Sequence, residues 1–112
     1  MEMQQVVKSL ADALDQKFGK DIVVLDIGRI SVIADYFVIA TGGNPNQINA
    51  LADAAHESLE KQGILARHVE GLQAANWVLM DFGDIIVHIF DEESRNFYNL
   101  ERVWGDATVI SV

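Results

Sequence analysis

The chain has 112 residues, half of them apolar, with no cysteine and with eight lysines and arginines against seventeen aspartates and glutamates. This length supports one compact core, so we expect a single domain over residues 1–112, and the missing thiols exclude disulfides, thiolate metal sites and cysteine nucleophiles. The net charge of -9 opposes sequence-independent binding to nucleic-acid phosphate and favours a basic protein partner.

Residues 3–18 predict an amphipathic helix, because apolar side chains recur at three- and four-residue steps from Val6 to Phe18, and Gly19 ends it. This segment lacks the apolar run of a signal peptide and the arginine-rich character of a transit peptide. No apolar stretch of the chain approaches the ~20 residues of a membrane helix. The sequence therefore predicts a soluble, cytoplasmic protein without membrane contact.

Two strands are predicted next, at residues 21–27 and 35–42, because both segments are rich in β-branched and aromatic residues; Gly28 follows the first and Gly42 ends the second. A second helix follows from Ile48 to Leu59, with Gly63 as its C-terminal cap. Residues 64–70 have mixed polarity, which is typical of a strand near the edge of a sheet.

The clearest pair of strands is 77–82 and 85–90, which Gly83 and Asp84 join at the spacing of a tight antiparallel hairpin. The second strand is apolar on both sides and should lie inside the sheet. Asp91 can cap a last helix that buries Phe97, Leu100 and Trp104. The order of elements predicts an α/β fold with one mixed five-stranded sheet and helices packed on it.

Five acidic residues lie within thirteen positions without a lysine or arginine among them: Asp81, Asp84, Asp91, Glu92 and Glu93. Such a cluster can hold magnesium only if its carboxylates converge. Turn formation at the hairpin and capping of the last helix explain the same residues without a metal, and we prefer that interpretation. No metal or other cofactor is expected.

His88 lies within a strongly apolar strand, where a buried imidazole needs a hydrogen-bond partner. It is either a structural histidine or a catalytic base. Because no serine or cysteine nucleophile motif accompanies it, the structural role is favoured, and we do not expect the protein to be an enzyme.

Trp77, Leu79 and Asp81 share one side of the first hairpin strand, and His88 shares a side of the next strand with Ile86. Aromatic side chains beside a few fixed polar groups are typical both of a protein-binding hot spot and of a sheet face under a helix. Whether the two sides coincide depends on the register of the hairpin, so the pattern alone favours neither interpretation.

On the last helix, Arg95, Tyr98 and Arg102 follow helical spacing on the side away from the predicted buried residues. This arrangement predicts a second ridge of contacts with a partner. Arg95 can alternatively pair locally with Asp91 or Glu92.

Four segments in this order closely resemble the Iojap family, the ribosomal silencing factors: DYFVIATG (35–42), EG (70–71), NWVLMDFGDIIVHIF (76–90) and ESRNFYNLERVWGDA (93–107). The resemblance covers nearly the whole chain. Ala40 departs from the pattern where many relatives carry cysteine, and residues 108–112 have no motif to match.

The resemblance implies a nucleotidyltransferase-like fold and binding to the large ribosomal subunit through its universal protein uL14. Such binding prevents joining of the small subunit and damps translation when nutrients are scarce. We predict Trp77 and Asp81 as the centre of this interface. The full set of predicted contact residues is Trp77, Leu79, Asp81, Asp84, His88, Arg95 and Tyr98.

Two alternatives remain open at this stage. A nucleotidyltransferase-like enzyme acting on a nucleotide substrate would need a Gly-Ser turn and paired acids on one strand, and the sequence has neither. A self-associating module would form homodimers that do not bind ribosomes. The sequence does not decide whether the free protein is a monomer or a homodimer.

Overall fold

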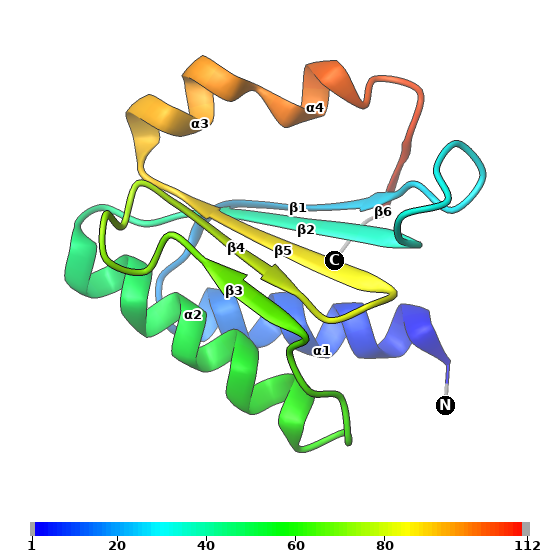
Figure 1. Ribbon diagram of the computed structural model, residues 1–112, viewed down its shortest axis with the longest axis horizontal. Coiled ribbons are helices and arrows are strands. Elements are labelled where there is room, and N and C mark those ends of the chain that lie inside the picture. Colours follow the sequence, from blue (N-terminus) through cyan, green and yellow to red (C-terminus); the bar gives the residue numbers. More distant parts are fainter. Residues whose placement is uncertain (1, 111–112) are drawn as a thin grey trace.

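Six strands form one mixed sheet in the order β3-β4-β5-β2-β1-β6, in a computed structural model that describes residues 2–110. The strands are β1 (Lys20–Asp26), β2 (Tyr36–Thr41), β3 (His68–Glu70), β4 (Trp77–Asp81), β5 (Ile85–Phe90) and β6 (Thr108–Ile110). Helices α1 (Met3–Gln16) and α2 (Pro45–Glu60) cover one face, and the short α3 (Glu92–Tyr98) and α4 (Leu100–Val103) cross the other (Figure 1).

The interior position predicted for residues 85–90 is confirmed. β5 pairs antiparallel with β4 on one side and parallel with β2 on the other. Both of its edges are therefore paired, and α2 packs on one of its faces and α3 on the other, which explains why it is apolar on both sides. The mixed α/β class is confirmed, and residues 68–70 form a strand at the edge of the sheet, as predicted, although it is shorter than expected.

The prediction of five strands is wrong, because residues 108–110 form a sixth. β6 is antiparallel to the last part of β1, with Val24 opposite Ile110 and Asp26 opposite Thr108. Three residues are too few to show a period-two pattern, and the strand exists only because the chain returns beside β1.

Helix α1 is shorter than predicted, and the prediction that Phe18 lies on its buried face is wrong. The helix ends at Gln16, and the amide of Gly19 donates to the carbonyl of Leu14 at 3.0 Å. Phe18 takes a φ of 63° there, which turns its side chain into solvent. The carbonyl of Phe18 accepts a hydrogen bond from the side-chain amide of Gln47 at 2.8 Å, which ties this turn to α2.

The last helix is not continuous. Asn99 adopts a left-handed conformation with a φ of 42° and separates α3 from α4. This break changes which residues face the sheet: Leu100 and Trp104 pack against it as predicted, whereas Phe97 is 79 % exposed, contrary to prediction. Asparagine tolerates this conformation better than most residues. The prediction for Phe97 failed because helical spacing assumes that the helix is unbroken.

Two clusters of buried side chains lie on opposite faces of the sheet. The larger cluster joins α1 and α2 to aliphatic residues of the strands, including Val78, Met80 and Ile89. The smaller one contains Phe37 and Phe90 and is only partly covered by α3 and α4. Within residues 2–110, no helix has the length and apolar character needed to cross a bilayer.

Candidate protein-interaction surface

The register of the β4–β5 hairpin places the predicted contact residues on one face of the sheet. Leu79 lies opposite His88, and Asp81 lies opposite Ile86. Residues directly opposite each other in an antiparallel pair share a face. The two sides whose relation the sequence left open therefore coincide, and Trp77 joins them, since it alternates with Leu79 along β4.

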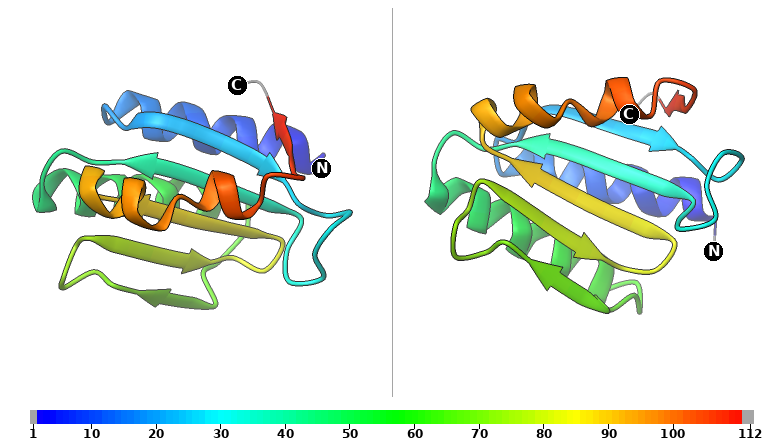
Figure 2. Two further views of the ribbon diagram at one scale, coloured as in Figure 1. Left: turned by 90° about the horizontal axis from the view of Figure 1, so that it is seen from above. Right: turned by 45° about the horizontal axis from the view of Figure 1, so that its top comes forward.

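This face is only half covered. Figure 2 shows α3 and α4 running above β5 and β2, whereas β4 and β3 have no helix above them. Trp77, Leu79 and Asp81 are each partly exposed, in contrast to the intervening Val78 and Met80, which are buried under α1 and α2. The exposed half of the sheet, called here the open face, is a surface that another molecule can reach.

Aromatic rings extend the open face onto α3. The ring centre of Trp77 lies 5.1 Å from that of Phe90 beneath it and 4.5 Å from that of Tyr98. Tyr98 in turn contacts Phe97 edge to face at 5.0 Å. Trp77, Tyr98 and Phe97 therefore form a continuous exposed group, called here the aromatic patch. Sequence reasoning missed Phe97, since helical spacing predicted it in the core.

His88 fixes the orientation of the indole. The Nε1–H of Trp77 donates a hydrogen bond to Nδ1 of His88 at 3.1 Å, and His88 is only 4 % exposed. Burial lowers the pKa of His88 to about 4. The imidazole is therefore neutral near pH 7, with its proton on Nε2, which has no partner among the described residues.

This geometry matches a structural role for His88, the role that the sequence favoured. The buried, neutral imidazole accepts a hydrogen bond from Trp77. This bond holds the indole in one rotamer and satisfies its N–H group. His88 itself is buried, whereas Trp77 is partly exposed, so only the indole of this pair reaches the surface.

Two of the five acidic residues have the structural roles predicted for them, Asp81 at the hairpin turn and Asp91 at the start of α3. Asp81 Oδ1 accepts from the amide of Gly83 at 2.8 Å, which stabilises the hairpin turn, and Asp91 Oδ1 accepts from the amide of Ser94 at 2.7 Å as the cap of α3. Asp84 is exposed at the turn. Among residues 2–110, no group of three histidine, aspartate or glutamate side chains is placed to hold a metal ion.

Arg95 does not form an exposed ridge, contrary to prediction, since its side chain is 7 % exposed. Its guanidinium donates to Thr41 Oγ1 and to the carbonyl of Asp21, both at 2.8 Å, and pairs with Glu101 at 3.1 Å. The predicted local pairing with Asp91 or Glu92 is also wrong. The break at Asn99 turns the chain so that Glu101 meets Arg95, which then attaches α3 to the sheet.

The strands and turns of the open face are rich in acidic residues, although Arg67 lies against Gly83 at the hairpin turn. Residues 68–94 contain no lysine or arginine, and their acidic members are Glu70, Asp81, Asp84, Asp91, Glu92 and Glu93. Asp91, Glu92 and Glu93 lie at the start of α3, the helix that carries Phe97 and Tyr98. Electrostatic complementarity suits this surface to a partner with basic side chains.

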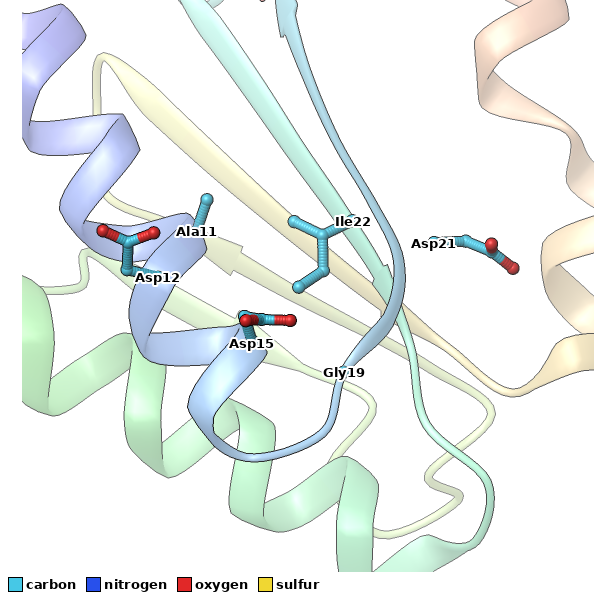
Figure 3. A pocket seen from close by; sticks show the side chains of 6 residues that line it. All are labelled: Ala11, Asp12, Asp15, Gly19, Asp21 and Ile22. Atoms are coloured by element: carbon cyan, nitrogen blue, oxygen red, sulfur yellow. The ribbon is translucent and has the colours of Figure 1, made fainter. Parts of the chain in front are cut away.

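A pocket of about 310 Å³ lies away from this surface, between α1 and β1. Asp12, Asp15 and Asp21 line it, but Figure 3 shows Asp21 pointing away from the two carboxylates of α1. Its carboxylates do not converge, and no cation lines the pocket to bind a phosphate. It therefore offers no arrangement for nucleotide or metal chemistry.

Comparison with known proteins gives consistent matches over the whole chain. The family model described as "Ribosomal silencing factor during starvation" matches residues 1–112. The chain is 41 % identical over 107 residues to "Ribosomal silencing factor RsfS" of Bacillus subtilis, covering 96 % of this chain and 91 % of that one. It is 38 % identical over 105 residues to "Protein Iojap, chloroplastic" of Zea mays, covering 93 % of this chain and 45 % of the plant protein.

Two solved structures share this fold. A crystal structure from Chromobacterium violaceum, 34 % identical in sequence, superposes with a TM-score of 0.89 over 94 % of this chain and 88 % of that chain. A second, from Bacillus halodurans, is 33 % identical and gives a TM-score of 0.84 over 97 % and 99 % of the two chains.

Proposed function

The chain belongs to the family of ribosomal silencing factors, and on that premise we propose that it binds the large ribosomal subunit through uL14 and blocks joining of the small subunit. The protein acts in the cytoplasm as a repressor of translation under nutrient limitation. It performs no chemical step, because occupancy of the subunit interface is sufficient to prevent joining.

The observation that carries this proposal is the aromatic patch beside the open face. Trp77, Tyr98 and Phe97 present apolar area that α3 and α4 leave uncovered, and His88 already fixes the indole. A preorganised aromatic side chain loses little conformational entropy on binding, so such residues dominate many interfaces. The carboxylates on the hairpin and at the start of α3 support a basic partner such as a ribosomal protein.

The roles of the contact residues follow from their positions. Trp77, Leu79 and Tyr98 supply apolar contact, and Asp81 and Asp84 meet basic side chains of uL14 at the edge. His88 and Arg95 act from beneath the surface, the first by orienting Trp77 and the second by holding α3 against the sheet.

The proposal is tested with purified protein mixed separately with large subunits, small subunits and assembled ribosomes. On a sucrose gradient the protein should comigrate with large subunits only, and it should slow subunit joining measured by light scattering. Comigration with small subunits or no effect on joining would contradict it. Calorimetric titration with magnesium and nucleoside triphosphates addresses the enzymatic alternative, which measurable binding would favour.

A further inference from the structure

A loop at one end of the sheet exposes three large apolar side chains. Residues 28–35 connect β1 to β2 and project beyond the sheet as the cyan loop of Figure 1. Val32 is fully exposed, Ile33 is 59 % exposed and Ile30 is 45 % exposed. Single exposed aliphatic residues are ordinary on a protein surface, but three within four positions form an apolar tip.

The loop is held in shape by its own hydrogen bonds. The amides of Ile30 and Ser31 both donate to the carbonyl of Ile27, at 3.0 and 2.9 Å, and the amide of Ile33 donates to Ser31 Oγ at 3.1 Å. The amide of Ile27 donates to the carbonyl of Asp35 at 2.9 Å, which closes the base. The apolar tip is therefore preorganised, and a partner does not have to order it.

The loop adjoins the open face. The amides of Asp35 and Tyr36 both donate to the carbonyl of Asp84, at 2.9 and 3.0 Å, so the base of the loop is joined to the turn of the β4–β5 hairpin. Asp81 and Asp84 mark this end of the open face, whereas Trp77 marks the other. A molecule that lies along β4 would therefore meet the aromatic patch at one end and the loop at the other.

We infer that the 28–35 loop is a second contact site, which inserts Val32 and Ile33 into an apolar recess of a protein on the large ribosomal subunit. The inference rests on the proposed function and adds a specific contact to it. Ribosomal RNA is a poor occupant, because the base of the loop carries Asp26, Asp35 and Asp84, and Arg29 is the only cation within residues 28–35.

The test is the double substitution Val32→Ser with Ile33→Ser, measured as affinity for purified large subunits. Both side chains are exposed, so the thermal melt should match that of the parent protein. Affinity should fall about tenfold or more, because the substitution removes apolar area that is buried only in the complex. Equal affinity of parent and variant would overturn the inference.

Two single variants serve as controls. Phe18→Asn removes an exposed aromatic ring at the opposite end of β1, at a left-handed position that asparagine tolerates, and should leave affinity unchanged. Arg29→Ala should change affinity less than the double substitution does. If Arg29→Ala has the larger effect and that effect shrinks as salt rises, the loop binds RNA phosphate and the inference is wrong.

Two further measurements address other occupants of the loop. Sedimentation velocity of the free protein would overturn the inference if a dimer formed that the double substitution abolished. Binding to phosphatidylcholine vesicles that the same substitution abolished would overturn it in favour of a membrane. Failure of the parent protein to bind large subunits is a different result: it removes the proposed function itself, and this inference with it.

Discussion

The two faces of β4 differ in how the fold uses them. Val78 and Met80 point into the larger cluster and are buried under α1 and α2, where they pack among aliphatic side chains. Trp77, Leu79 and Asp81 alternate with them and stay partly exposed on the open face. Neighbouring residues of one short strand therefore have different roles. Val78 and Met80 stabilise the core, whereas Trp77, Leu79 and Asp81 form part of a surface.

The comparison shows how a surface can be ordered without being covered. The buried face gains its order from close packing of aliphatic groups between sheet and helices. The open face depends on directed contacts, including the hydrogen bond from Trp77 to His88 and the attachment of α3 through Arg95. Directed contacts fix side chains that remain available to a partner, so changes on the two faces should have different consequences.

The largest difference is expected between Met80→Ala and Leu79→Ala, two neighbours of similar size on opposite faces. Met80→Ala leaves a cavity under α1 and α2 and should lower the free energy of unfolding by about 3 kcal/mol. Leu79→Ala should cost less than half of that and should weaken binding to large subunits instead. Chemical denaturation of both variants measures this, and equal destabilisation would contradict the division between the faces.

Acidification should weaken the fold through His88. The pKa of His88 is lowered from 6.5 to about 4 by burial, so the unfolded chain binds a proton in this range that the folded protein excludes. Stability from this group is complete above pH 6.5 and is lost as pH falls towards 4, by roughly 2 kcal/mol between pH 7 and 4.5.

The measurement is the pH dependence of unfolding free energy for the parent protein and for His88→Gln. Glutamine can still accept from Trp77 but does not titrate, so the difference in slope between the two proteins isolates the histidine from the many carboxylates. Identical slopes between pH 4.5 and 6.5 would show that His88 is protonated in the folded protein.

Arg95→Met should cost about 2 kcal/mol of unfolding free energy, because Thr41 Oγ1 and the carbonyl of Asp21 lose their donor inside the protein. Glu101 is more exposed and can be hydrated, so Glu101→Gln should cost less. Near-equal losses for the two variants would indicate that the ion pair is the main contribution of Arg95. Proteolysis within α3 should become faster in Arg95→Met if Arg95 attaches this helix to the sheet.

The smallest effect is expected at the rim of the open face. Asp84→Asn changes an exposed carboxylate and should leave the melt unchanged, while it weakens binding to large subunits about threefold at low salt. The matched control is Asp12→Asn on α1, far from the open face. If both substitutions alter binding equally, only net charge matters and Asp84 makes no specific contact.

The sequence predicted most of the fold because its signals are local. The interior place of residues 85–90 follows from their two-sided apolar character, and the cap at Asp91 uses a side chain next to the helix start. β6 could not be predicted, since three residues have too little pattern and form a strand only by pairing with β1. Helical spacing wrongly grouped Phe97 with Leu100 and Trp104, because the positive φ of Asn99 breaks the helix between them.

The candidate site was predictable in part for the same reason. Alternation along β4 grouped Trp77 with Leu79 and Asp81, but only the observed register brings His88 to the same face. The burial of Arg95 depends on Thr41, which lies 54 residues away in the chain. Phe97 was assigned to the core by a helix assumed to be continuous, although it belongs to the aromatic patch.

The central claim is that the open face binds the large subunit through Trp77, and Trp77→Ala tests it most directly when binding and stability are measured on one preparation. Affinity for large subunits should fall about thirtyfold or more, as is usual at a hot spot, together with the block on subunit joining. The melt should stay cooperative but lose about 2 kcal/mol, because the buried Nδ1 of His88 loses its donor while the rest of the core is unchanged. Normal binding would remove Trp77 from the interface, and a collapsed melt would assign it to the core.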